Sequence, residues 1–191
     1  FPLLFLIILN KIKESKMNIT TRPFTNDEIT ALILKSNTPW KEIYFLAFYT
    51  GLRISDLMSL PWQPWPISYP IYEQKSKKTK LINFTELSRQ YWNSLYNYGN
   101  KREYLFPFRD PSTYRKAIQR DCIRFDIDPY RIAFHSIRKT HAVLTYKHSG
   151  LLAANATLNH SNIKITQKYI ENALRFDCGL IIDELFTPKT K

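Results

Sequence analysis

A short apolar run that ends at a glycine constrains the fold of this chain more than any other feature. Residues 43–49 read IYFLAFY, Gly51 follows, and Arg53 comes two positions later. A helix that is apolar on all sides is buried in a core, and glycine is typical just past a helix end. The sequence therefore predicts a buried helix that starts at the cap and proline of Thr38-Pro39 and ends at Gly51.

Arg53 lies in an otherwise core-like stretch, LRISDL, and has two interpretations there. Burying an arginine is costly unless partners compensate its charge. If the stretch is helical, Asp56 three residues later is placed to form an internal ion pair with Arg53. The alternative is that Arg53 serves a functional site. The stretch by itself fits both interpretations equally.

Capping signals and apolar spacing predict further helices. Thr25 and Glu28 form a capping-box pattern ahead of an apolar stripe. Two more helices are expected over 85–98 and 111–125. The expected apolar positions of these three helices are Ile29, Leu32 and Ile33, then Leu87, Tyr91 and Leu95, then Tyr114, Ile118 and Cys122.

The final third of the chain reads as helices broken at Gly150 and again over residues 159–161. Ser161 is the predicted N-cap of the helix that contains Tyr169. A last apolar segment follows over residues 179–186, before a basic tail.

One hairpin is predicted between these helices. Residues 71–75 and 80–84 read as strands around a polar turn at 76–79. The four lysines of the hairpin are Lys75, Lys77, Lys78 and Lys80. They form a cationic finger that suits a phosphate backbone, although solvated turns are often lysine-rich without such a role. Together these elements predict a fold that is mainly α with a small antiparallel β-sheet (α+β).

The charge balance favours a polyanionic partner. The chain has 28 lysines and arginines against 16 acids, a net charge of +12. Such an excess makes nucleic acid the first candidate, with a generally basic protein as the plain alternative. The distant cysteines Cys122 and Cys178 are expected to be free thiols in a reducing cytosol. The opening run FPLLFLIIL is too short for the roughly 20 apolar residues of a membrane span.

Residues 134–170 bring together the side chains that carry chemistry. They contain His135, Arg138, His160 and Tyr169 without a cluster of carboxylates. Cationic donors suit an anionic phosphate, because phosphoryl transfer spreads negative charge over the equatorial oxygens. Arginine stays charged and donates two parallel bonds. The sequence offers no metal-ligand set and implies no cofactor, so arginines would take the place of metal ions.

Four motifs in this order resemble the catalytic domain of the tyrosine recombinase, or phage integrase, family. The resemblance spans roughly residues 21–186. The motifs are TGLRISDLMSL at 50–60, QKSKKTKLINF at 74–84, HSIRKTHA at 135–142 and LNHSNIKITQKYI at 158–170. Each alone is a weak match, but four in the family's order are specific.

The resemblance implies roles for the matching positions. Arg53 and Arg138 would clamp the non-bridging oxygens of the scissile phosphate. Lys75 would be the general acid for the departing 5′ oxygen, with Lys77 or Lys78 as alternatives if the hairpin register differs.

The resemblance gives the remaining roles to two histidines and a tyrosine. His135 would assist proton transfer, and His160 would donate a hydrogen bond to the phosphate. Tyr169 would attack phosphorus and form a 3′-phosphotyrosyl intermediate. A phenol has an ordinary pKa near 10, so it needs help to lose its proton at neutral pH.

The expected function is therefore site-specific cleavage and rejoining of double-stranded DNA in the cytoplasm. A non-catalytic DNA-binding relative and a type IB topoisomerase are the alternatives. We expect residues 1–16 to be an upstream extension, residues 17–191 to form the catalytic domain, and no N-terminal core-binding domain. The resemblance also implies a homo-oligomer on DNA, in which residues 179–186 dock on a neighbouring protomer.

Overall fold

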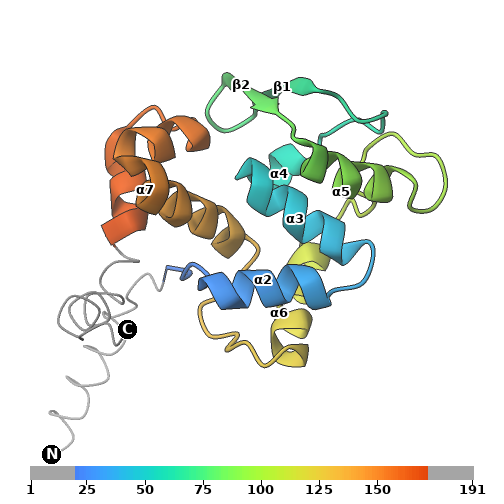
Figure 1. Ribbon diagram of the computed structural model, residues 1–191, viewed down its shortest axis with the longest axis horizontal. Helices are drawn as coiled ribbons and strands as arrows, with labels where there is room; N and C mark the ends of the chain where they lie inside the picture. The colour runs from blue at the N-terminus through green and yellow to red at the C-terminus, as the bar shows by residue number, and fades with distance from the viewer. Residues whose placement is uncertain (1–19, 172–191) are drawn as a thin grey trace, which may run out of the picture.

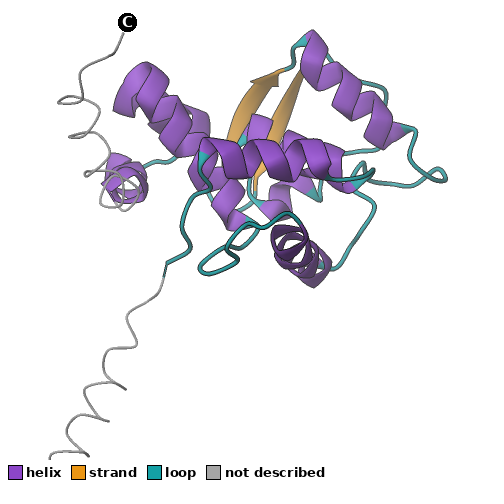
Figure 2. Cartoon of the chain, turned by 60° about the horizontal axis from the view of Figure 1, so that its bottom comes forward, coloured by secondary structure: helices purple, strands orange, loops and turns teal. Residues whose placement is uncertain are grey.

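The computed structural model describes residues 20–171 of the chain. The elements are α2 (Asn26–Lys35), α3 (Trp40–Thr50), α4 (Ile54–Leu57), β1 (Ser68–Glu73), β2 (Lys78–Asn83), α5 (Glu86–Tyr96), α6 (Pro111–Arg124) and α7 (His135–Leu158). A last helix begins at residue 163 and runs to the end of the described range. The predicted fold class, mainly α with a small antiparallel β-sheet, is confirmed (Figures 1 and 2). No helix in this range is long and apolar enough to cross a bilayer.

Helix α3 is the central element of the core, as its all-round apolarity predicted. It contacts α2, α5 and α7, which surround it in Figure 1. It ends at Gly51, which adopts the left-handed conformation (φ 61°) that glycine tolerates. The predicted cap at Thr38 is wrong. Pro39 occupies the N-cap position, and the Thr38 hydroxyl instead donates to the Glu42 carboxylate at 3.0 Å.

Helix α2 begins with the predicted capping box. The Thr25 hydroxyl accepts from the backbone N–H of Glu28, and the Glu28 carboxylate accepts from the backbone N–H of Thr25. This satisfies two backbone donors that a helix start leaves unpaired. The predicted apolar stripe, Ile29, Leu32 and Ile33, is buried.

The hairpin exists, but its strands are displaced from the predicted ones. Strand β1 pairs with β2 in antiparallel register from Ser68 opposite Asn83 to Glu73 opposite Lys78. The turn occupies residues 74–77, and Lys77 has a positive φ of 56°. Strand β1 starts in the proline-rich stretch. Within residues 20–171 the sheet has two strands, so Pro70 lies on an edge strand, where proline is tolerated. The displacement moves Lys75 from the predicted strand into the turn.

Helix α5 buries Leu95 as predicted, and Tyr91 packs against the core, but the predicted burial of Leu87 is wrong. Leu87 is 54% exposed, whereas Ser88, Trp92 and Leu95 are buried. Trp92 determines this orientation. Its ring packs edge-on against Phe84, with 5.2 Å between the ring centres, and its indole N–H donates to the Gln63 carbonyl at 3.0 Å. In α6 the predicted core positions Tyr114, Ile118 and Cys122 are all buried. Cys122 is a free thiol, and Cys178 lies outside the described residues.

Helix α7 carries site residues near both of its ends and is interrupted between them. Gly150 has non-helical angles (φ 82°, ψ 177°), which confirms the predicted break. Asn159 then ends α7 in the left-handed conformation (φ 52°, ψ 35°). The predicted cap at Ser161 is wrong by one residue. The Asn162 side chain accepts from the backbone N–H of Lys164 at 2.9 Å and so caps the last helix.

Candidate active site

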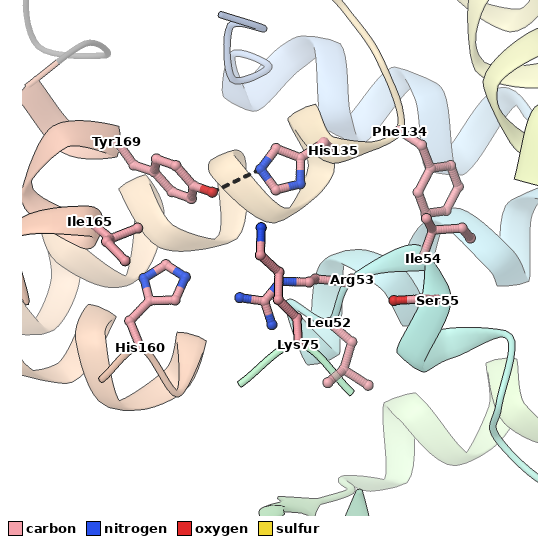
Figure 3. A pocket seen from close by; sticks show the side chains of 10 residues that line it. All are labelled: Leu52, Arg53, Ile54, Ser55, Lys75, Phe134, His135, His160, Ile165 and Tyr169. Atoms are coloured by element: carbon pink, nitrogen blue, oxygen red, sulfur yellow. Dashed lines mark hydrogen bonds between the residues drawn. The ribbon is translucent and has the colours of Figure 1, made fainter. Parts of the chain in front are cut away.

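A cavity of about 380 Å³ brings together five of the six predicted site residues (Figure 3). Its lining residues are Leu52, Arg53, Ile54, Ser55, Lys75, Phe134, His135, His160, Ile165 and Tyr169. They come from the segment after α3, the hairpin turn, the start of α7, the link that follows α7 and the last helix. The sixth predicted residue, Arg138, is 1% exposed and lies against His160.

Arg53 occupies the N-cap position of α4, where the end of α3 at Gly51 directs the chain into the cavity. Its Nη1 lies 4.0 Å from an Asp56 oxygen and 3.5 Å from Glu73 Oε2. The predicted Arg53–Asp56 ion pair is therefore present, and Arg53 also lines the cavity. Arg53 is thus both a member of an internal ion pair and a residue of the site. One nitrogen of its guanidinium lies near the carboxylates, while the side chain still faces the cavity.

Arg138 is fixed by backbone carbonyls from two parts of the chain. It donates to the Gly51 carbonyl at 2.6 Å and to the Leu158 carbonyl at 2.8 Å. Burial, and next the positive charge of Arg53, lower the pKa of Arg138 to about 10. It therefore remains charged at neutral pH, as an electrostatic clamp requires.

Tyr169 and His135 form a direct pair. The Tyr169 hydroxyl lies 2.9 Å from His135 Nε2, shown by the dashed line in Figure 3. Partial burial, and next the charges of Arg138 and Lys139, lower the pKa of His135 to about 4. A neutral His135 accepts the phenolic hydrogen at Nε2. The Lys139 ammonium lies 5.3 Å from the centre of the Tyr169 ring, where a cation–π contact holds the ring from a second side.

His160 is held in one tautomer by its neighbours. The Asn155 amide nitrogen donates to the His160 carbonyl, so its oxygen faces Thr166 and accepts from the Thr166 hydroxyl at 2.9 Å. His160 Nδ1 must then donate to the Thr166 oxygen at 2.9 Å. His160 Nε2, 3.1 Å from Arg138, accepts, because arginine only donates. Burial, and next Arg138, lower the pKa of His160 to about 4. Donation from Nε2 to a phosphate therefore requires a protonated ring.

Lys75 is the hairpin lysine that lines the cavity, on the turn between β1 and β2. Lys77 and Lys78 are exposed and are not among its lining residues. Lys80 has another role, since it donates to the Thr50 carbonyl at 2.6 Å. Burial, and next the charge of Arg138, lower the pKa of Lys80 to about 8.

Comparison with known proteins agrees with this geometry. The sequence model of the phage integrase family matches residues 22–175. The chain belongs to the phage integrase family. Comparison with curated protein sequences found no match.

Solved structures show the same fold. The integrase chain is similar to the XerA recombinase with a TM-score of 0.69 at 21% identity, covering 90% of this chain and 65% of that one. It is also similar to the Tn1549 transposon integrase in complex with a circular intermediate DNA, with a TM-score of 0.65 at 15% identity, covering 84% and 66%. The catalytic domain of bacteriophage HP1 integrase gives a TM-score of 0.60 at 21% identity, covering 88% and 96%. The chain thus spans slightly less than two thirds of the first two relatives.

Sequence reasoning missed one acidic residue beneath the integrase site, Glu73. Glu73 is fully buried and lies 3.5 Å from both Arg53 and Arg138. The only available signal was strand alternation, because Glu73 shares the inward face of β1 with the buried Ile71. Among the described residues, no group of histidines, cysteines and carboxylates could hold a metal ion.

Proposed function

We propose that this integrase domain cleaves and rejoins double-stranded DNA through Tyr169, in site-specific recombination. The single observation that carries the proposal is the 2.9 Å contact between the Tyr169 hydroxyl and His135 inside a cavity lined by Arg53 and Lys75. A nucleophile bonded to a base, next to cationic donors, is the arrangement that metal-free phosphoryl transfer needs. The DNA complex of the similar Tn1549 integrase supports the choice of substrate.

In the first step, the Tyr169 oxygen attacks phosphorus and its proton passes to His135 Nε2. A DNA phosphate in the cavity offsets the cations that lower the pKa of His135, so the imidazole becomes a better base when DNA is bound. Arg53 and Arg138 stabilise the charge that develops on the non-bridging oxygens. Both must stay cationic, and Arg138 does so at neutral pH because its pKa is about 10.

In the second part of the same displacement, the bond from phosphorus to the 5′ oxygen breaks. Lys75 gives a proton to that oxygen, and the DNA strand remains attached to Tyr169 as a 3′-phosphotyrosine. The new ester conserves the energy of the broken bond. A free 5′ hydroxyl therefore reverses the reaction and rejoins the strand without ATP.

Covalent capture tests the proposal. A nicked suicide substrate loses its 5′ fragment after cleavage and leaves the protein joined to DNA. We expect the wild-type protein to form this adduct and Tyr169→Phe to form none, because phenylalanine has no nucleophilic oxygen. Tyr130→Phe is the matched control, since Tyr130 is 63% exposed and is not among the cavity's lining residues.

The same assay separates the two alternative functions. Salt-dependent DNA binding without an adduct on any site would support a non-catalytic DNA-binding relative. Relaxation of supercoiled plasmid without sequence preference would support a type IB topoisomerase. Docking through residues 179–186 remains a prediction, since that segment lies outside the described residues.

A further inference from the structure

A buried carboxylate lies between the two arginines of the site. Glu73 is 0% exposed. Its Oε2 is 3.5 Å from Arg53 Nη1 and its Oε1 is 3.5 Å from Arg138 Nη1. Oε2 also accepts from the Ser76 hydroxyl at 2.8 Å and from the Asn159 amide at 3.3 Å. The Glu73 side chain therefore connects the hairpin turn, the N-cap of α4, the first turn of α7 and the C-cap of α7.

The two hydrogen-bond donors to Glu73 are the sequence neighbours of two further site residues. Ser76 directly follows Lys75 on the hairpin turn, and Asn159 directly precedes His160 at the end of α7. A shift of the Glu73 carboxylate would therefore move the backbone that carries Lys75 and His160, as well as the arginines themselves.

Two guanidinium groups that lie against the same carboxylate are close enough to repel each other. This repulsion is felt at Arg138, whose pKa is lowered first by burial and next by the charge of Arg53. Asp56 lies 4.0 Å from Arg53 and helps to compensate that charge. Among residues 20–171, Glu73 is the carboxylate that lies within 4.0 Å of both arginines.

Glu73 compensates these charges without using the arginine donors. Both ion-pair distances of 3.5 Å are longer than an ordinary charge-assisted hydrogen bond of about 2.7–2.9 Å. Arg53 Nη1 and Glu73 Oε1 are buried and have no hydrogen-bond partner. Unpaired buried donors are costly, and here one of them belongs to a side chain that lines the cavity. The arrangement leaves Arg53 Nη1 without a hydrogen bond, between the carboxylates of Asp56 and Glu73.

We propose that Glu73 is the positioning residue of the arginine clamp: its carboxylate compensates the charges of Arg53 and Arg138 and holds the two side chains in place without a hydrogen bond to either. This inference rests on the proposed function of the same site. Glu73 acts through the arginines and does not touch the DNA. Its negative charge also opposes phosphate binding, so its removal should slow cleavage without weakening DNA binding.

The test is single-turnover adduct formation on the suicide substrate at increasing protein concentration. For Glu73→Gln, which keeps the shape and removes the charge, we expect the maximal rate to fall at least about 10-fold. The protein concentration that gives half-maximal rate should stay the same or decrease. The matched control is Glu42→Gln, because Glu42 is another buried glutamate (4% exposed) that accepts from two hydroxyls, on α3 and outside the cavity lining. It should cleave at the wild-type rate.

An unchanged maximal rate in Glu73→Gln would overturn the inference, as would an equal loss in both variants. A second measurement is independent of catalysis. Nitrogen-15 NMR of the arginine Nε–H groups in the DNA-free protein should show the Arg53 and Arg138 signals shifted and broadened in Glu73→Gln and unchanged in Glu42→Gln. If the wild-type protein forms no adduct, the proposed function fails, and these spectra still decide the role of Glu73: unaltered arginine signals refute it.

Discussion

At the scale of single residues, the orientation of His160 depends on a threonine outside the cavity lining. Thr166 is fully buried, and its hydroxyl accepts from His160 Nδ1 and donates to Asn155. In Thr166→Val the shape is kept, but a buried donor and a buried acceptor lose their partners. Because such groups cost about 1–3 kcal/mol when left unpaired, we expect roughly 10-fold slower adduct formation. Thr157→Val removes only a bond to a carbonyl within α7 and should cleave normally; equal rates for both variants would contradict the prediction.

Substitutions of Lys75 and Lys78, two lysines of the same hairpin, test which side chain donates the proton to the departing oxygen. Lys75 lines the cavity, whereas Lys78 is exposed on β2. General acids contribute about 10²–10⁴-fold, so Lys75→Gln should slow adduct formation by at least about 100-fold. A substrate with sulfur in place of the bridging 5′ oxygen needs no proton and should restore most of the rate. Lys78→Gln should cleave at the wild-type rate; a loss there, restored by sulfur, would make Lys78 the acid.

At the scale of elements, the bend of α7 depends on Gly150. Its angles (φ 82°, ψ 177°) lie in a region that is almost exclusive to glycine. Nothing lies within 4 Å of an added Cβ, so any cost of substitution comes from the backbone. We expect Gly150→Ala to lower the free energy of unfolding by about 1–3 kcal/mol in urea denaturation. Gly99→Ala, at an ordinary left-handed position (φ 71°), should cost less, and equal stability of Gly150→Ala and wild type would refute this account.

The elements also show how far local patterns reach. The start of α2 and the end of α3 were predictable, because Thr25 and Gly51 act on backbone groups within a few residues. In α5, spacing predicted the burial of Leu95 but not that of Trp92. Tyr91 and Trp92 lie on different sides of the helix, and either side could have been buried. The contact of Trp92 with Phe84 determines that the Trp92 side is buried.

At the scale of the whole molecule, buried neutral histidines make stability depend on pH. Burial, as the first cause, lowers the pKa of both His141 and His160 to about 4, against 6.5 for an ordinary histidine. The unfolded chain therefore binds more protons below pH 6.5, so stability is full above that pH and is lost as the pH falls toward 4. Between pH 7 and pH 5 we expect a loss on the order of 2 kcal/mol from each histidine, measured by urea denaturation.

A variant identifies one source of this dependence. His141 lies against Gly51 and bonds to the Phe48 carbonyl at 2.9 Å, so its ring is held within the core next to α3. His141→Gln lowers stability at neutral pH but does not titrate, and its loss between pH 7 and pH 5 should be smaller than that of the wild type. An equally steep decline would show that other groups are responsible.

The sequence by itself determined the capping box of α2, the glycine end of α3, the order of the six site residues and the strongly basic charge, because these depend on neighbours along the chain. The apolar helix α3 is buried as predicted, and its end at Gly51 places Arg53 at the cavity. Only the tertiary structure decided that Glu73 lies between Arg53 and Arg138, which are 85 residues apart in the sequence. Charges from distant segments compensate one another only when the chain packs, since no local pattern specifies which side chains meet in a core.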